Sequence, residues 1–247
     1  MLKFWKWLFR IVLVGIVLLA VFILVVYFTL PDTSILIEEN PKTTAIIEQR
    51  IAAAKARGRT LKIRQKWVSF NAIPDMLKKT VRITEDANFY FHQGIDFEEL
   101  QESLKKNFTE GKVVRGGSTI TQQLAKNLYL STDRSLLRKI REYFITQRLE
   151  GSLSKDRIMH LYLNVIEFGP GIFGVEAAAR YYFGKTAIRL DIDEIVRLVA
   201  VIPKPLKVKP TGSSRWLYWK CCWITRKLKL YKYIDQEMYE QLSGVFC

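Results

Sequence analysis

The chain has 247 residues, 49% of them hydrophobic and 26% charged, a length that suits one domain of ordinary size together with the segments that place it. Its formal net charge of +15 calls for an anionic partner, but no nucleic-acid-binding motif accompanies the positive residues, so no nucleic acid is expected among the partners. The two histidines and the spacing of the three cysteines argue against a histidine-based triad, a zinc site and a disulfide framework. Cys221, Cys222 and Cys247 are therefore expected to be buried or tolerated thiols.

Residues 11–30 carry no charge, and a helix of that length reaches roughly 30 Å, the thickness of a bilayer's hydrocarbon core. Lys3, Lys6 and Arg10 precede the segment, so the positive-inside rule places residues 1–10 in the cytoplasm and the bulk of the chain outside. The alternative is a cleaved signal peptide, whose apolar region is about 7–15 residues long and ends in small residues. The longer run found here, which ends in Tyr-Phe-Thr-Leu-Pro, favours an uncleaved transmembrane signal anchor.

Residues 31–65 are predicted to form a juxtamembrane connector with one helix, and residues 66–247 a compact, mainly α-helical domain. Few stretches alternate as strands do, and glycines separate the helical patterns. The expected helices of the connector and the domain cover residues 43–57, 72–88, 97–107, 119–128, 135–150, 155–165, 174–182 and 192–201.

Two adjacent carboxylates, Glu85 and Asp86, stand near the end of the apolar pattern of residues 72–88. Because neighbouring residues on a helix point about 100° apart, the two should have different roles. One can face a cleft while the other caps or braces the following loop. The alternative is a solvated helix end, which this pair on its own would favour.

A glycine pair, Gly116 and Gly117, leads into a helix start at Ser118 and Thr119. Thr119 and Gln122 fit a capping box, and the free N–H groups of such a start suit a phosphate. The alternative is an ordinary capped helix with an amide-rich surface. However, Thr-Ile-Thr-Gln-Gln is unusual where Glu and Lys normally stand, so a functional interpretation is favoured. The buried stripe of this helix is expected to consist of Ile120, Leu124 and Leu128.

Glu142 follows Arg134 by eight residues and Arg138 by four, so the three side chains share one helix face. A carboxylate beside several cations stays ionised. The alternative is a surface ion-pair ladder, which contributes little stability, and Arg placed before Glu is the weaker orientation for such a pair. The core face of this helix is expected to consist of Leu136, Leu137, Ile140 and Phe144.

The segment from Lys155 to Lys185 is predicted to be scaffold, since the small residues Ala177–Ala179 permit close helix packing. Residues 215–223 mix aromatic and basic side chains. That composition suits a membrane interface. It suits a terminal helix packed on the domain equally well, and both interpretations stay open.

In their order and spacing, these segments resemble the glycosyltransferase domain shared by monofunctional peptidoglycan transglycosylases and class A penicillin-binding proteins. The similarity runs from about Trp67 to Pro210, and no transpeptidase segment follows it, which points to the monofunctional type. His160 stands where the family usually has Glu. The first motif comprises Glu85, Asp86, Phe89, His92, Gly94 and Asp96, the second runs from Gly117 to Asn127, and the third comprises Arg138, Lys139 and Glu142.

The resemblance implies a lysozyme-like helical lobe and a smaller, membrane-proximal lobe, with a long cleft between them. It implies an enzyme that polymerises lipid II into β-1,4-linked glycan strands, with release of polyprenyl diphosphate and inversion at the donor anomeric carbon. The implied partners are lipid II, the nascent lipid-linked glycan, the membrane, and other cell-wall synthesis or division proteins. The domain would face the periplasm from the bacterial cytoplasmic membrane, with the N-terminus inside.

By the same resemblance, Glu85 is the general base and Glu142 a charged supporting residue near the diphosphate, and apolar neighbours such as Phe89 are expected to raise the pKa of Glu85. The cations expected to bind the diphosphate are Lys126, Arg134, Arg138 and Lys139. The expected sugar or phosphate contacts, or braces of the cleft, are Ser118, Thr119, Gln122, Gln123 and Asn127. The residues expected to shape the motif are Asp86, Phe89, His92, Gly94 and Gly117.

No metal ligand and no obligatory cofactor is predicted, although an assisting divalent cation, Mg²⁺ or Mn²⁺, is compatible with a diphosphate leaving group. Two alternative functions stay open. One is a lysozyme-like glycan hydrolase, which would share the cleft and an acidic residue. The other is a non-catalytic, membrane-anchored scaffold for wall-synthesis proteins.

Overall fold

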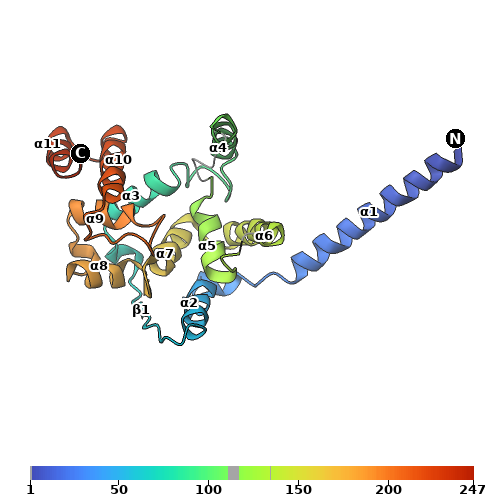
Figure 1. Cartoon of the computed structure of the whole chain (residues 1–247), viewed down its shortest axis with the longest axis horizontal. Helices are drawn as coiled ribbons and strands as arrows, with labels where there is room; N and C mark the ends of the chain where they lie inside the picture. Colours follow the sequence, from blue (N-terminus) through green and yellow to red (C-terminus); the bar gives the residue numbers. More distant parts are fainter. Residues whose placement is uncertain (1, 111–116, 134) are drawn as a thin grey trace.

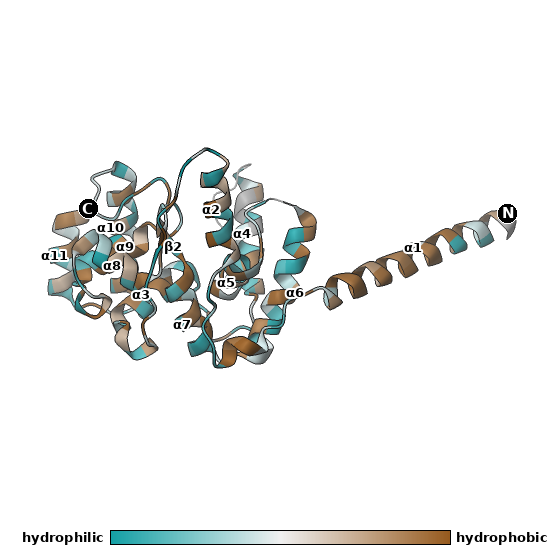
Figure 2. Ribbon diagram, turned by 90° about the horizontal axis from the view of Figure 1, so that it is seen from below, coloured by the Kyte–Doolittle hydropathy of each residue, from teal (hydrophilic) through white to brown (hydrophobic). Residues whose placement is uncertain are grey.

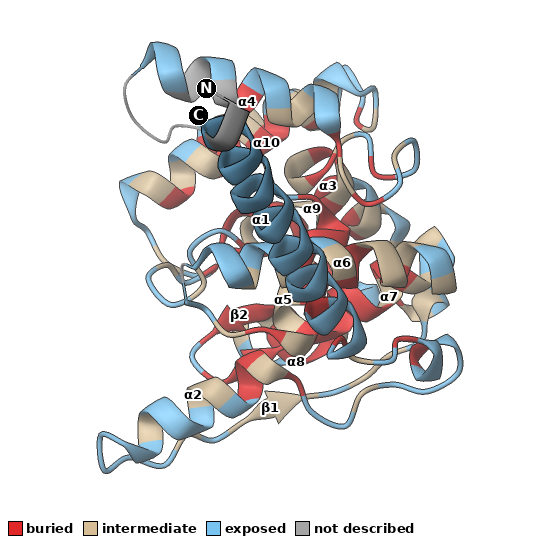
Figure 3. Ribbon diagram, turned by 90° about the vertical axis from the view of Figure 1, so that its right-hand side faces the viewer, coloured by how far each residue is buried: buried red, intermediate tan, exposed pale blue. Residues whose placement is uncertain are grey.

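The computed structural model describes residues 2–110, 117–133 and 135–247. Its first element, α1 (Leu2–Phe28), projects away from the remaining helices, and almost all of its length is apolar and exposed (Figures 1, 2 and 3). Residues Phe4–Phe28 are long and apolar enough to cross a membrane. The predicted anchor helix is therefore present, but it begins before residue 11 and takes Lys6 and Arg10 into its first turns.

The connector packs on the domain. Thr44 caps α2 (Ala45–Lys55) by accepting a hydrogen bond from the Ile47 backbone N–H, and Ile46 and Ile47 pack against Phe173. A 3₁₀ turn, η1, covers Ser34–Ile37.

The domain is mainly helical, as predicted, and its helices lie close to the expected ranges. At its centre lies α5, which contacts α2, α6 and α7 (Figure 1). The helices of the domain are α3 (Asp75–Glu85), α4 (Phe97–Thr109), α5 (Ile120–Tyr129), α6 (Leu136–Ser152), α7 (Lys155–Val165), α8 (Val175–Phe183), α9 (Ile192–Ala200), α10 (Arg215–Leu230) and α11 (Gln236–Phe246), with 3₁₀ turns η2 (Phe70–Ala72) and η3 (Ala187–Arg189).

A small sheet ties the connector to the domain. Its strands are β1 (Arg64–Gln65), β2 (Glu167–Gly169) and β3 (Ile172–Phe173), in the order β1-β3-β2. The β1–β3 pair is parallel and the β2–β3 pair antiparallel. Gly171, in the turn between β2 and β3, has a φ of +75°, and a Cβ there would stand 2.5 Å from the Lys62 carbonyl oxygen, so a side chain is excluded.

The prediction for the core face of α6 was wrong. Leu136 and Leu137 are 85% and 47% exposed, and Ile140 is also exposed, whereas Glu142 is buried. Only Phe144 of the expected set is partly buried against the core. The inward face of α6 consists of Glu142, Ile145, Thr146 and Leu149. A hydrophobic pattern identifies an apolar helix face but does not say whether protein or another apolar phase covers it.

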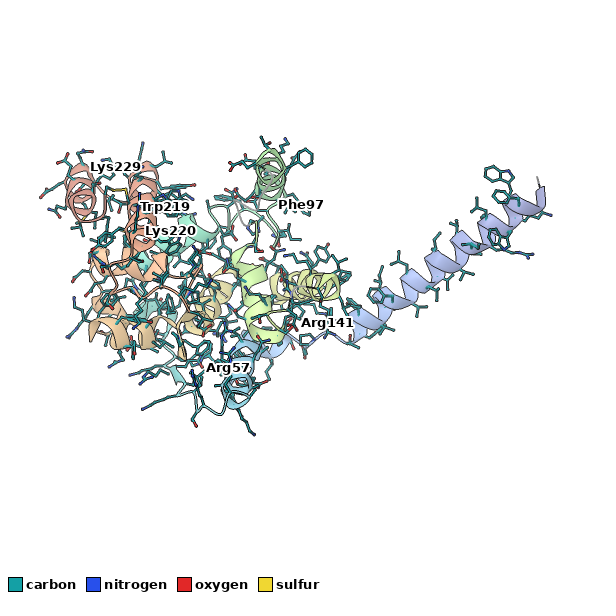
Figure 4. The ribbon with its side chains drawn as sticks, viewed as in Figure 1. Arg57, Phe97, Arg141, Trp219, Lys220 and Lys229 are labelled. Carbon is teal, nitrogen blue, oxygen red and sulfur yellow. A yellow bond between two sulfur atoms is a disulfide. The ribbon has the colours of Figure 1, made fainter. Side chains whose placement is uncertain are left out.

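The C-terminal end of α1 is held by α6. Arg148 donates hydrogen bonds to the carbonyl oxygens of Tyr27, Leu30 and Pro31, and its guanidinium lies 4.6 Å from the centre of the Tyr27 ring. Arg141, which Figure 4 shows beside the end of α1, donates to the Thr29 carbonyl oxygen. The apolar outer face of α6 therefore lies close to the point where α1 leaves the domain.

The expectation of three unpaired thiols was also wrong. Cys222 in α10 and Cys247 at the chain end form a disulfide that joins α10 to the end of α11, while Cys221 is a buried free thiol. Helix α10 itself packs on the domain through Leu217, Ile224 and other buried side chains, although Trp219 is exposed. One face of α10 thus packs on the domain, as one of the two interpretations expected. The disulfide could not be predicted from the cysteine spacing, because its two cysteines lie 25 residues apart.

Reducing the Cys222–Cys247 disulfide should lower the free energy of unfolding by about 3 kcal/mol, because the cross-link restricts the unfolded chain over a loop of intermediate length. Urea unfolding of the full chain in mild detergent, with and without dithiothreitol, measures the difference. The double variant Cys222→Ser/Cys247→Ser is the control and should be insensitive to the reductant. Equal stability of the oxidised and fully reduced wild type would contradict the expected contribution.

Candidate active site

The loop after α3 is organised by Asp86, which ends the helix one residue beyond Glu85. One Asp86 carboxylate oxygen accepts a hydrogen bond from the Ile120 backbone N–H at 2.9 Å, and the other lies 2.9 Å from His92 Nε2. Asp86 is buried and thereby joins the end of α3 to the start of α5. The two adjacent carboxylates do have different surroundings, as their 100° separation predicted.

The start of α5 is the capping box that the sequence predicted. Thr119 Oγ1 accepts from the Gln122 backbone N–H, and Gln122 Oε1 accepts from the Thr119 N–H. Thr119 Oγ1 also donates to the Gly94 carbonyl oxygen at 2.6 Å. Gly94 has a φ of +82°, and a Cβ there would lie 2.6 Å from Thr146 Cγ2, so the loop can approach α6 only with glycine at this position.

Glu85, the last residue of α3, lies in an environment that disfavours charge. Its Oε2 accepts a 3.0 Å hydrogen bond from Gln123 Nε2, and Gln123 Oε1 in turn accepts from the Tyr162 hydroxyl at 3.0 Å. Burial raises the pKa of Glu85, while the Gln123 hydrogen bond and nearby lysines oppose that rise. Gln123 is thus placed beside Glu85. Phe89, the apolar neighbour expected to raise this pKa, is fully buried against the rings of Tyr90 and His92.

Two of the lysines that act on Glu85 come from α10 and were not predicted. Lys220 Nζ lies 3.7 Å from the centre of the Trp223 ring and Lys227 Nζ lies 4.5 Å from it, and Lys227 also donates to the Ile83 carbonyl oxygen. Figure 4 shows Lys220 on α10, on the side of that helix where α3 lies. In the sequence, the only sign of these two lysines is that Lys220, Trp223 and Lys227 are spaced along one helix face. They lie more than 130 residues after Glu85 in the chain, so the sequence did not show that they approach it.

Glu142 is held by the two cations expected beside it. Arg138 Nη1 and Lys139 Nζ each donate to one of its carboxylate oxygens at 2.5 Å, and the carboxylate is buried. Arg138 Nε is also buried and has no hydrogen-bond partner among the described residues, so this guanidinium retains a donor that an anion could use. The pair is therefore a buried ion pair and not a surface ladder.

Lys126 of α5 links the two carboxylates. Burial lowers the pKa of Lys126, the negative charges of Glu142 and Glu85 raise it, and Arg138 and Lys139 lower it. Lys126 follows Gln123 by three residues on α5, so the two side chains share the side of that helix on which Gln123 donates to Glu85. Arg138 and Lys139 bind Glu142, and the charges of both glutamates act on Lys126.

Other predicted residues have different positions. Ser118 is exposed beside the capping box, and Asn127 is partly exposed on α5. A Cβ added at Gly117 would lie 3.4 Å from Leu100 Cδ1. Arg134 lies outside the described residues. His160 stands where the family usually has Glu. Its Nδ1 lies 2.9 Å from Arg157 Nη1, and its Nε2 lies 2.7 Å from the Val68 carbonyl oxygen.

One group of metal-ligand types exists among the described residues, formed by Asp86, His92 and Asp96. Each of its carboxylate oxygens already has a hydrogen-bond partner within the loop. Those partners are His92 and the Ile120 N–H for Asp86, and Asn88 and the Glu99 N–H for Asp96. The group is thus a self-contained brace of the loop and does not fit the open ligand set that a divalent cation requires.

The fold and the site together describe a helical domain that follows an apolar helix long enough to span a membrane and holds two carboxylates in unlike surroundings, a class suited to acid–base chemistry beside an anionic group. The transglycosylase family model matches residues 53–229. A biosynthetic peptidoglycan transglycosylase of Janthinobacterium sp. is 42% identical over 200 residues, which cover 81% of this chain and 85% of that protein. One from Thiobacillus denitrificans is 46% identical over 179 residues, covering 72% and 77% of the two chains. The chain belongs to the transglycosylase family, which confirms the resemblance of its motifs.

Replacing Arg138 by Met should destabilise the domain by about 3 kcal/mol, because it removes one partner of a buried carboxylate. The double variant Arg138→Met/Glu142→Gln should recover much of that loss, since the uncompensated charge is removed as well. Thermal and urea unfolding of the full chain in detergent measure both. The control is Arg189→Met, an exposed arginine on η3, which should leave stability unchanged. A double variant less stable than Arg138→Met would contradict the buried ion pair as the cause.

Proposed function

We propose that the chain is a peptidoglycan glycosyltransferase that polymerises lipid II into glycan strands of the cell wall. The relatives named above are biosynthetic peptidoglycan transglycosylases, and they match this chain over most of their length. The substrate is a disaccharide carried on a polyprenyl diphosphate. A membrane-anchored enzyme with a cationic site suits a lipid-borne, anionic donor.

Glu85 is the general base. Its carboxylate accepts the proton of the acceptor sugar's 4-hydroxyl while that oxygen attacks the anomeric carbon of the donor. Attack opposite the leaving group inverts that carbon and forms the β-1,4 linkage. The burial that raises the pKa of Glu85 makes it a stronger base than a solvated glutamate, and the Gln123 hydrogen bond orients it.

The bond that breaks joins the anomeric carbon to a diphosphate oxygen, and the electron pair leaves with the diphosphate. Lys126, Arg138 and Lys139 stabilise the negative charge that develops there. Glu142 keeps the two cations of α6 in position and compensates their charge when no substrate is bound. Arg138 Nε supplies a donor to which no group in the described part of the chain is hydrogen-bonded.

The observation that carries this proposal is the position of Lys126. Lys126 lies three residues after Gln123, which hydrogen-bonds Glu85. Burial lowers the pKa of Lys126, and the charges of Glu142 and Glu85 both raise it. A base and a phosphate-binding cation group must lie within one sugar of each other for this reaction, because the attacked carbon lies between them. Neither a glycan hydrolase nor a scaffold needs such a group of cations beside the base.

The membrane lies against the outer face of α6. Leu136, Leu137, Ile140 and Tyr143 form an exposed apolar stripe there, and the arginines of the same helix hold the end of α1. Such a stripe suits burial at the boundary of headgroups and acyl chains. With Lys6 and Arg10 before the apolar run, the N-terminus lies in the cytoplasm and the catalytic domain in the periplasm.

Replacing Glu85 by Gln should lower the rate of lipid II polymerisation about 10²–10⁴-fold, the contribution of a positioned general base. In the wild type, kcat/KM should fall as the pH drops through the pKa of Glu85, which burial raises above its ordinary value of 4.5. The residual activity of Glu85→Gln should lack that acid limb. Polymer and released polyprenyl diphosphate are measured with purified full-length protein in detergent micelles.

Glu48→Gln, a change of an exposed glutamate on α2, is the matched control and should polymerise at the wild-type rate. Polymerisation by Glu85→Gln at the wild-type rate would refute the assignment of the base. Shortening of pre-formed glycan by the wild type, without polymer, would indicate a hydrolase. No reaction with either substrate would leave the scaffold as the better interpretation.

A fluorophore attached to Leu137→Cys should shift its emission to shorter wavelengths when the protein is reconstituted in vesicles, because the outer face of α6 enters an apolar environment. The matched control is Leu230→Cys, an exposed apolar position on α10 away from α1, where the label should stay in water (Figure 1). Equal spectra at the two positions would contradict the proposed contact. In spheroplasts, a membrane-impermeant maleimide should label Leu230→Cys, and failure to label it would reverse the topology.

A further inference from the structure

A pocket of about 280 Å³ lies on the flank of α3, outside the group formed by Glu85, Glu142 and Lys126. It is built from η2, α3, the loop after α3 and the turn that joins α10 to α11. No residue assigned above to acid–base or diphosphate chemistry lines it. The side chains that carry the argument are Phe70, Lys78, Lys79, Arg82, Tyr90 and Tyr233.

Aromatic rings hold the cations of this pocket in place. Lys78 Nζ lies 4.2 Å from the centre of the Phe70 ring. The Arg82 guanidinium carbon lies 5.9 Å from the ring centres of both Tyr90 and Tyr233, and Arg82 donates a hydrogen bond to the Tyr233 hydroxyl. Such contacts orient a cation without neutralising it, so its charge stays available to a ligand.

The pocket carries more positive than negative charge. Its one carboxylate, Asp75, pairs with Lys78 at 2.7 Å and points mainly into solvent, with 81% of its side chain exposed. Lys79 lies 5.4 Å from the Tyr233 ring centre. Among the described residues, no carboxylate pairs with Lys79 or Arg82. The Tyr90 hydroxyl donates to Asp156, and the Tyr233 hydroxyl accepts from Arg82. Two positive charges beside tyrosine rings suit a carboxylate carried on a larger, partly apolar group.

The pocket adjoins the proposed base. Arg82 precedes Glu85 by three residues, just under one turn, which is about 4.5 Å along the axis of α3. Between them, Lys227 of α10 donates to the Ile83 carbonyl oxygen, and Tyr233 continues from the end of the same helix. A ligand whose reactive hydroxyl lies at Glu85 can therefore extend along α3 and reach Arg82.

We propose that this pocket binds a carboxylate of the peptide attached to the acceptor sugar. The proposal rests on the proposed function, since the acceptor of a peptidoglycan glycosyltransferase carries such a peptide on the sugar next to the reacting one. Arg82 makes the principal contact through its planar donor set, Lys79 adds charge, and the tyrosines hold Arg82 and cover the peptide backbone. The pocket thus contributes to substrate selection without taking part in the chemical step.

Arg82→Gln tests the proposal in the full-length protein. Loss of the charged contact should raise KM about tenfold for lipid II that carries its peptide, with kcat unchanged, because a contact outside the reacting centre is equally strong in ground and transition states. KM for a lipid-linked disaccharide without the peptide should stay the same. Arg189→Gln, an exposed arginine on η3, is the matched control and should change neither value.

Equal KM changes of Arg82→Gln for the two substrates, or none for either, would overturn the proposal. A similar rise for the peptide-free substrate would instead assign the pocket to the sugars or to a lipid phosphate. Thermal unfolding of Arg82→Gln is expected to match that of the wild type, which excludes misfolding as the cause. Lys79→Gln, a change of an exposed residue, should raise KM less, and again only for the substrate that carries the peptide.

A wild type that polymerises neither substrate would refute the proposed function itself. That result is distinct from an active wild type whose Arg82→Gln variant does not distinguish the two substrates.

Discussion

The side chain of Gln123 hydrogen-bonds in two directions, to Glu85 at the end of α3 and to Tyr162 of α7. Since Gln123 itself belongs to α5, this one amide joins three helices at the point where the site is built. The side-chain carboxylate of Asp86 also joins α3 to α5, by accepting from the Ile120 backbone N–H at the start of α5. The geometry of the site therefore depends on how α5 is seated between α3, α6 and α7. A partly buried amide with both ends satisfied favours one seating, because rotating it would leave polar atoms unpaired.

The charges around this junction are arranged unequally. Glu142 has two cations at hydrogen-bonding distance, so it is a compensated, buried ion pair. Glu85 has a neutral amide as its direct partner, and its cations, Lys126, Lys220 and Lys227, act from farther away. The two carboxylates therefore differ in their direct partners, one bound by cations and the other by an amide. Helix α10 also has a part in the site, because two of the three lysines come from it, and the disulfide to Cys247 fastens α10 to the end of α11.

Helix α6 faces two environments at once. Its inward face carries Glu142 to the site, and its outward face carries an exposed apolar stripe next to the end of α1. Arg141 and Arg148 tie this helix to the end of α1. Under the proposed function, that link sets the height of the site above the membrane, so that the lipid-borne substrate meets the cations Arg138 and Lys139 of the same helix.

Much of this protein could be predicted from the sequence alone, for local physical reasons. The presence of the anchor helix, the limits of the helices predicted between residues 43 and 201, and the capping box of Thr119 and Gln122 depend on neighbouring residues, and these predictions were correct within a few positions, although α1 begins at Leu2 and not at residue 11. The pairing of Glu142 with Arg138 followed in the same way from spacing along one helix. Tertiary structure decided the rest. The outward face of α6, the disulfide between Cys222 and Cys247, and the approach of Lys220 to Glu85 each join segments whose distance in the chain says nothing of their distance in space. Periodicity reveals which side of a helix is apolar, but only the packing of α5, α6 and α10 determines what that side meets.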